Sequence, residues 1–274
     1  MLHRYLLAIV VVVASTVPSL AQTPWQFHWQ KGQVLTYKIK HVTSVTEVVG
    51  KDKSASSSDL ELVKRWQVTE LDNQGIATVS LTLIAMRNEQ KRPNGETLLF
   101  DSKNLEKSAP ALKEGMSKFV GQTLAVIRID GYGRVVEVKQ GNTARYEAEP
   151  PFVVVFPAAK AEKGQVWRRQ YNLVMDPPLG TGEKYQAEQR YECTNIKGTV
   201  ATLAVATSFK TMPESMRERL PLLQKDVQGD VQFDLQAGRI VSTTFNIDKT
   251  IENHQGKDSS YRFQSKYAEE LVGN

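Results

Sequence analysis

One strand-like pattern occurs twice in this chain and limits what it can fold into. Residues 32–39 read GQVLTYKI, in which apolar residues alternate with polar ones, the period of a half-buried β-strand. Residues 164–171, GQVWRRQY, repeat the opening and the alternation in altered form. The sequence therefore predicts two tandem, divergent copies of one curved antiparallel sheet unit, each opened by this strand.

Further matches follow the same order in both copies. We interpret these matches as duplication of one unit. The alternative is chance similarity, because short alternating strands all resemble one another. The matched sets are Leu35, Ile39 and His41 with Trp167, Tyr171 and Leu173; Leu60, Leu62, Trp66 and Val68 with Tyr185, Ala187, Tyr191 and Cys193; residues 77–81 with 201–205; Ile127 and Ile129 with Phe233 and Leu235; and residues 133–136 with 238–241.

Each copy also contains one stretch with helical periodicity. In the first, Ser108 is expected to cap a helix that begins near Pro110 and ends before Gly121. In the second, residues 214–223 are expected to be helical, with Pro221 ending or bending the helix. The polar, Ser-rich residues 51–59 are expected to form a hairpin loop. The predicted fold class is α+β, mainly β, with one short helix per copy.

Three segments divide the chain. Residues 1–21 are predicted to be a secretory signal peptide, with a basic start, an apolar run and a small-x-small cleavage site; an uncleaved N-terminal anchor is the alternative. Residues 22–149 and 150–274 are the two predicted copies. Each is expected to form its own curved sheet, and the two sheets to pack as one body or as two tightly joined lobes. Residues 150–157 are either a short buried strand or the joint between copies. A final strand around Phe263 is expected to cover a sheet edge.

Cysteine usage and charge indicate the compartment and exclude some partners. The single cysteine, Cys193, cannot form an intrachain disulfide, so an exported chain must be held together by its core, as is typical of a bacterial periplasm. The net charge of +5 is modest, and basic and acidic residues alternate. We therefore expect no nucleic-acid partner and, after signal cleavage, no transmembrane segment.

The sequence shows no catalytic constellation. The three histidines after the signal lie far apart without metal-ligand spacing, so we expect no metal and no cofactor. Cys193 lies on an apolar face and is expected to act as a buried small hydrophobe. Residues 180–184, GTGEK, lack the spacing of a phosphate loop and are expected to form a hairpin. We expect a non-enzymatic protein; a hydrolase with an unrecognised site is the alternative.

Two polar residues fall at equivalent positions on apolar faces. Lys64 and Gln189 either line a cavity or mark where each strand leaves the core, because an unpartnered buried lysine would be costly. Aromatic residues on the same faces either line a cavity for an apolar ligand or form a solid core. The candidate cavity-lining residues are Lys64, Trp66, Trp167, Tyr171, Gln189 and Tyr191.

Four motifs carry a resemblance: residues 32–34 (GQV), 65–68 (RWQV), 177–182 (PPLGTG) and 259–263 (SSYRF). Together they resemble an uncharacterised family of exported bacterial proteins, a domain of unknown function to which no activity is attached. The twofold β-plus-helix plan resembles envelope lipid carriers and lipoprotein chaperones, whose curved sheet shelters apolar ligands. These resemblances imply export to the periplasm or beyond, and a possible apolar ligand or envelope protein partner. A structural module with a solid core and no small ligand is the alternative.

Overall fold

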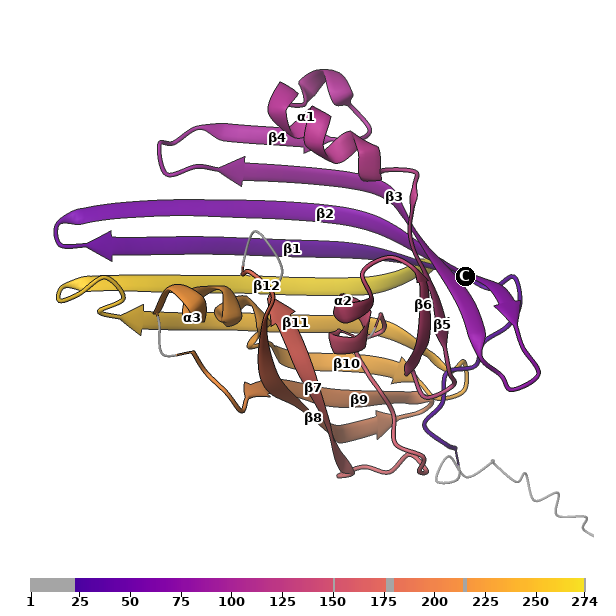
Figure 1. Ribbon diagram of the computed structural model, residues 1–274. Coiled ribbons are helices and arrows are strands. Elements are labelled where there is room, and N and C mark those ends of the chain that lie inside the picture. The colour runs from indigo at the N-terminus through magenta and orange to yellow at the C-terminus, as the bar shows by residue number, and fades with distance from the viewer. Residues whose placement is uncertain (1–22, 150, 176–179, 214–215, 274) are drawn as a thin grey trace, which may run out of the picture.

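Twelve strands form one antiparallel sheet in the computed structural model, which describes residues 23–149, 151–175, 180–213 and 216–273 (Figure 1). The prediction of a mainly β, antiparallel α+β fold is confirmed. The sheet is continuous, so the expectation of two separate sheets is wrong. The strand order is β6-β5-β3-β2-β1-β12-β11-β10-β9-β8-β7, with β4 paired to β3.

The elements have the following bounds. The strands are β1 (Val34–Val49), β2 (Asp52–Leu71), β3 (Ala77–Lys91), β4 (Thr97–Asp101), β5 (Thr123–Ile129), β6 (Val135–Gln140), β7 (Val166–Met175), β8 (Glu183–Lys197), β9 (Val200–Phe209), β10 (Gln228–Asp234), β11 (Arg239–Glu252) and β12 (Ser259–Gly273). The helices are α1 (Pro110–Met116), α2 (Thr143–Ala148) and α3 (Met216–Leu222).

The same strand order is read twice across the sheet. β6-β5-β3-β2-β1 lies on one side of β12, and β11-β10-β9-β8-β7 lies on the other. Each side has one α-helix before its fourth long strand, α1 before β5 and α3 before β10. The first side also contains β4 and is followed by α2, elements that the sequence patterns did not indicate.

Cross-strand pairing is also shared by the two sides. Leu35 lies opposite Trp66 as Trp167 lies opposite Tyr191. A β-bulge follows Val68 in the β2–β3 ladder, and one follows Cys193 in the β8–β9 ladder. One match was wrong by two residues. Ile127 and Ile129 correspond by register to Val231 and Phe233, not to Phe233 and Leu235.

The sheet curls around an aromatic core, and a segment ahead of β1 fills its inside. In that segment Trp25 and Phe27 are almost fully buried; their rings pack on Phe156. The amide of Phe27 donates to the Gly131 carbonyl and that of His28 to the Gly238 carbonyl. The segment therefore bridges the β5–β6 turn of one side and the β10–β11 turn of the other.

These two turns require glycine because the segment lies so close. At Gly133, with φ of 83°, a Cβ would lie 2.8 Å from the Phe27 ring. At Gly238, with φ of 59°, a Cβ would lie 2.4 Å from His28. A side chain at either position would displace the segment as well as strain the turn.

Residues 151–161 form the joint, which crosses the core as irregular chain rather than as a strand. Phe152, Val154 and Phe156 are buried in it. The two outer strands of the sheet, β6 and β7, both contact α2, which lies between them (Figure 1). The sheet edges are thus connected through a helix and not by strand pairing.

The other local predictions have mixed outcomes. Residues 52–59 lie in β2, so the predicted loop is reduced to a tight turn at Gly50 and Lys51. The Ser108 hydroxyl accepts from the Asp101 amide and does not cap α1. Helix α3 ends one residue after Pro221. β7 and β8 pair as the hairpin expected at residues 180–184 requires, and residues 176–179 of their connection lie outside the described residues.

The final strand, β12, lies inside the sheet between β1 and β11. It therefore covers an edge of each side and joins them. Within the part of the chain that the structure describes, no helix is both long and apolar enough to cross a membrane. Residues 1–21, the predicted signal, lie outside the described residues.

Candidate functional site

The aromatic candidates belong to the core. Trp66 packs on Phe152, and the Trp167 ring stacks on Tyr191 with centroids 5.3 Å apart. The indole Nε1 of Trp167 donates to the Val155 carbonyl. Burial raises the pKa of Tyr191 to about 12, since its phenolate would be desolvated. The joint thus packs against three of the aromatic rings that the sequence singled out.

Lys64 and Gln189, matched by sequence, occupy the same place in the two ladders. The Lys64 ammonium lies 2.7 Å from a carboxylate oxygen of Glu269, and both side chains are largely buried. Gln189 instead accepts a hydrogen bond of 2.9 Å from Arg169. Each position therefore has a polar partner, which removes the cost of burying it alone.

Further polar groups surround these two pairs. Tyr267 donates to Glu269 at 2.6 Å, and burial raises its pKa. The guanidinium of Arg169 lies 4.3 Å from the centroid of the Tyr171 ring. Burial lowers the pKa of His41, whose Nε2 lies 2.8 Å from the Ser265 hydroxyl. The inner face of the sheet thus holds two polar clusters, one in each half of the molecule.

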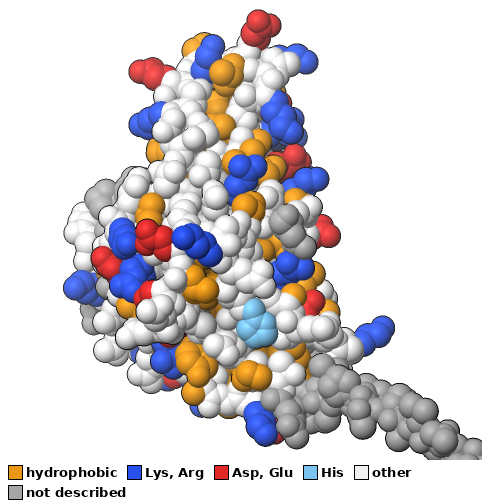
Figure 2. Space-filling model, turned by 90° about the vertical axis from the view of Figure 1, so that its right-hand side faces the viewer, with side chains coloured by type: hydrophobic (Ala, Val, Ile, Leu, Met, Phe, Trp, Pro, Cys, Tyr) orange, Lys and Arg blue, Asp and Glu red, His pale blue; other side chains and the backbone are white. Residues whose placement is uncertain are grey.

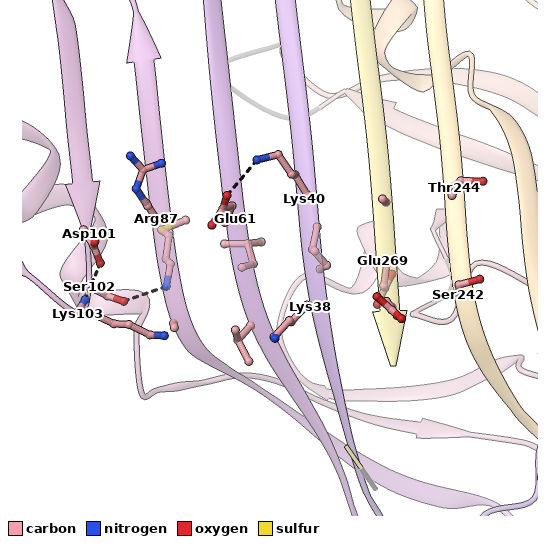
Figure 3. A pocket seen from close by; sticks show the side chains of 17 residues that line it. Lys38, Lys40, Glu61, Arg87, Asp101, Ser102, Lys103, Ser242, Thr244 and Glu269 are labelled. Atoms are coloured by element: carbon pink, nitrogen blue, oxygen red, sulfur yellow. Dashed lines mark hydrogen bonds and ion pairs between the residues drawn. The ribbon is translucent and has the colours of Figure 1, made fainter. Parts of the chain in front are cut away.

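A pocket of about 580 Å³ lies over the centre of the sheet (Figure 3). Its lining residues come from six strands, β1, β2, β3, β4, β11 and β12, and from the turn after β4. Residues such as Ile39 and Leu62 also border it, although strand alternation directs their side chains to the inner face. The lining residues are Lys38, Ile39, Lys40, Glu61, Leu62, Val63, Ala85, Met86, Arg87, Asp101, Ser102, Lys103, Ser242, Thr244, Ala268, Glu269 and Glu270.

Strand register arranges the outward side chains of this pocket in two rows. Directly opposed residues in neighbouring strands share a face. The first row is Ala85, Val63, Lys38, Glu270 and Ser242. The second row is Asp101, Arg87, Glu61, Lys40, Ala268 and Thr244. The pocket is therefore on the outer face, opposite the aromatic core.

β-Bulges lie beside this pocket. In the β2–β3 ladder Lys64 pairs with Leu83 and Val63 with Ala85, so Ile84 is an extra residue. The β1–β12 ladder has a second irregularity between Thr36 and Tyr37. A bulge bends its strand and increases its twist, and Figure 3 shows the strands bending at one end of the pocket.

Most charged side chains of the second row are ion-paired, whereas two other lysines of the pocket lining are not. Lys40 bridges Asp59 and Glu61 at 3.2 and 3.0 Å, and Arg87 contacts Glu89. Lys38 and Lys103 have no ion-pair partner among the described residues. Elsewhere charges of both signs are interspersed, as Figure 2 shows for one face of the molecule.

None of the six candidate residues lines this pocket. Alternation in the sequence shows that Lys38 and Lys40 face away from the core, but nothing in it indicates a pocket beside them. The Cys193 thiol is buried, and this burial raises its pKa. Among the described residues no cluster of three or more His, Cys, Asp or Glu side chains could hold a metal ion.

Comparisons with known proteins add little to this geometry. No protein-family model matches the chain, and no curated protein does. DynF, from the dynemicin biosynthesis pathway of Micromonospora chersina, is a solved structure that aligns with 99% of this chain and 93% of its own, at 9% identity. Its TM-score of 0.24 is too low to carry an argument about fold or function.

Proposed function

We propose that this chain is a non-enzymatic, exported protein of the bacterial envelope that binds an apolar ligand in the outer-face pocket. The observation that supports the proposal is the apolar floor formed by Val63 and Ala85, surrounded by charged residues. The pocket volume of about 580 Å³ lies within the range of roughly 300–1,000 Å³ typical of small-molecule sites.

The test is native mass spectrometry of the protein purified from the envelope of an exporting host. The wild type is expected to retain a bound ligand, and Val63→Asp to lose it because a carboxylate then occupies the floor. Val42→Asp is the matched control: Val42 also faces outward on β1, at a position that does not line the pocket. Identical spectra for the wild type and Val63→Asp would contradict the proposal.

A second candidate function is docking of an envelope protein. It is favoured by the part of the sheet beyond His41, which we call the distal sheet: residues 42–49 of β1, 52–60 of β2, 247–252 of β11 and 259–266 of β12. Every residue from Val42 to Val48 is half-exposed, so neither face of β1 is fully covered there. Crosslinking in the envelope through the variant Val48→Cys would recover such a partner. Val136→Cys, on edge strand β6, is the control and should recover none.

A further inference from the structure

The two unpaired lysines of the pocket extend into the same part of it. Figure 3 shows the side chains of Lys38 and Lys103 extending toward each other from opposite sides of β2 and β3. Lys38 comes from β1, and Lys103 from the turn after β4, where its amide donates to the Asp101 carboxylate. Two ammonium groups thus converge on one part of the pocket.

The floor between these ammonium groups is apolar. Val63 lies directly opposite Lys38, and Ala85 lies directly opposite Val63. Positive charge above small aliphatic side chains matches a ligand with an anionic head and an apolar body. The head can then pair with the ammonium groups, and the body can pack on the aliphatic side chains.

The acids of the pocket limit how much negative charge a ligand can carry. Glu61 is engaged by Lys40, and Glu269 by Lys64. Glu270 lies opposite Lys38 on the side away from Val63, with no ion pair among the described residues. This carboxylate repels an anion from the β12 side and favours a position over Val63. A multiply charged head would also meet Glu61 and Asp101.

We propose that the ligand is a singly charged anionic amphiphile, with a carboxylate-type head held between Lys38 and Lys103 and an apolar body on Val63 and Ala85. This inference rests on the proposed function of the pocket. It adds the sign and number of the ligand's charges, which the apolar floor alone does not determine.

The test is isothermal titration calorimetry of the exported protein with three probes below their micellar concentrations: decanoate, decylamine and acetate. Decanoate is expected to bind. Decylamine and acetate should each bind at least tenfold more weakly, because decylamine carries a positive instead of a negative charge and acetate has no apolar tail. The Lys38→Gln, Lys103→Gln double variant is expected to lose about tenfold in decanoate affinity, the effect of roughly one charge-assisted contact.

Lys266→Gln is the matched control, because Lys266 is an exposed lysine on the same outer face of β12, at a position that does not line the pocket. Its affinity for decanoate is expected to equal that of the wild type. Equal binding of decanoate and decylamine, both abolished by Val63→Asp, would overturn the charge assignment and leave the proposed function standing. Failure of all three probes, with no ligand retained from the envelope, would remove both.

Discussion

The outer faces of the two sides of the molecule differ at equivalent positions. The first side presents Lys38, Val63 and Ala85 in a row, whereas the corresponding row of the second is Gln170, Glu188 and Ser208. Glu188 is engaged by Arg168 and Lys210, both 3.4 Å away. One strand order therefore supports a pocket with an apolar floor on one side and an ion-pair network on the other.

The ladders beneath these rows also differ. Ile84 interrupts the β2–β3 ladder next to Val63, but the β8–β9 ladder runs without a shift through Glu188 and Gln189. The bulge near Val68, in contrast, has a counterpart near Cys193. The shared bulge therefore belongs to the common framework, whereas the bulge at Ile84 accompanies the pocket.

The largest expected effect comes from removing what joins the two sides. Phe27→Ala deletes a buried ring that packs on Phe152, Phe156 and Phe233, and should lower the free energy of unfolding by about 3–5 kcal/mol. Urea denaturation followed by tryptophan fluorescence measures this loss. The variant keeps the backbone hydrogen bonds of the segment to both turns, so the two halves should still unfold in one transition. Two separate transitions would show that the halves are energetically independent.

The next effect concerns the inner-face pairs. Glu269→Gln leaves the Lys64 ammonium buried without its carboxylate and should cost about 3 kcal/mol in urea denaturation. The double variant Lys64→Met, Glu269→Gln should recover most of this loss, because no buried charge remains. Glu61→Gln, which removes an exposed partner of Lys40, should cost less than about 1 kcal/mol. A loss equal to that of Glu269→Gln would contradict the assigned difference in burial.

A small effect on stability is also expected for deletion of Ile84. The side chains of Leu83 and Ala85 already point to opposite faces of the sheet, so removing Ile84 leaves the rest of β3 in register with β2. The shortened strand then pairs without a bulge, as β9 does beside Glu188. Stability should change by about 1 kcal/mol or less, while decanoate binding is lost because the sheet flattens beside Val63. Calorimetry and urea denaturation on the same sample check both parts. Undiminished binding by a folded deletion variant would show that the bulge does not shape the pocket.

The strands were predictable wherever one face is buried. Alternation located β1, β3 and β9 because their inward residues must exclude water. It failed for residues 52–59, whose Ser-rich sequence resembles a loop. There the backbone pairs with β1 along its whole length and with β3 at residues 57–59, and tertiary pairing overrides low strand propensity.

The pocket was less predictable for a related reason. Its walls come from residues such as Lys38, Lys103 and Glu270, which lie far apart in the sequence. Glu270 meets Lys38 through the β1–β12 pairing, and Lys103 lies near them through the ladders from β1 to β4. The partner of Lys64 was hidden in the same way, because Glu269 belongs to the last strand. A single sequence shows which face a residue occupies, but not which distant strand will lie beside it.

The position of β12 has a consequence for the order of folding. All the other described strands precede it in the chain, and β1 and β11 pair with it and not with each other. The ladder between β1 and β12 therefore links segments at opposite ends of the described chain. Contacts between residues so far apart in the sequence form slowly. Until β12 has paired, the two halves of the sheet lack the strand that joins them, so we expect the sheet to be completed late in folding.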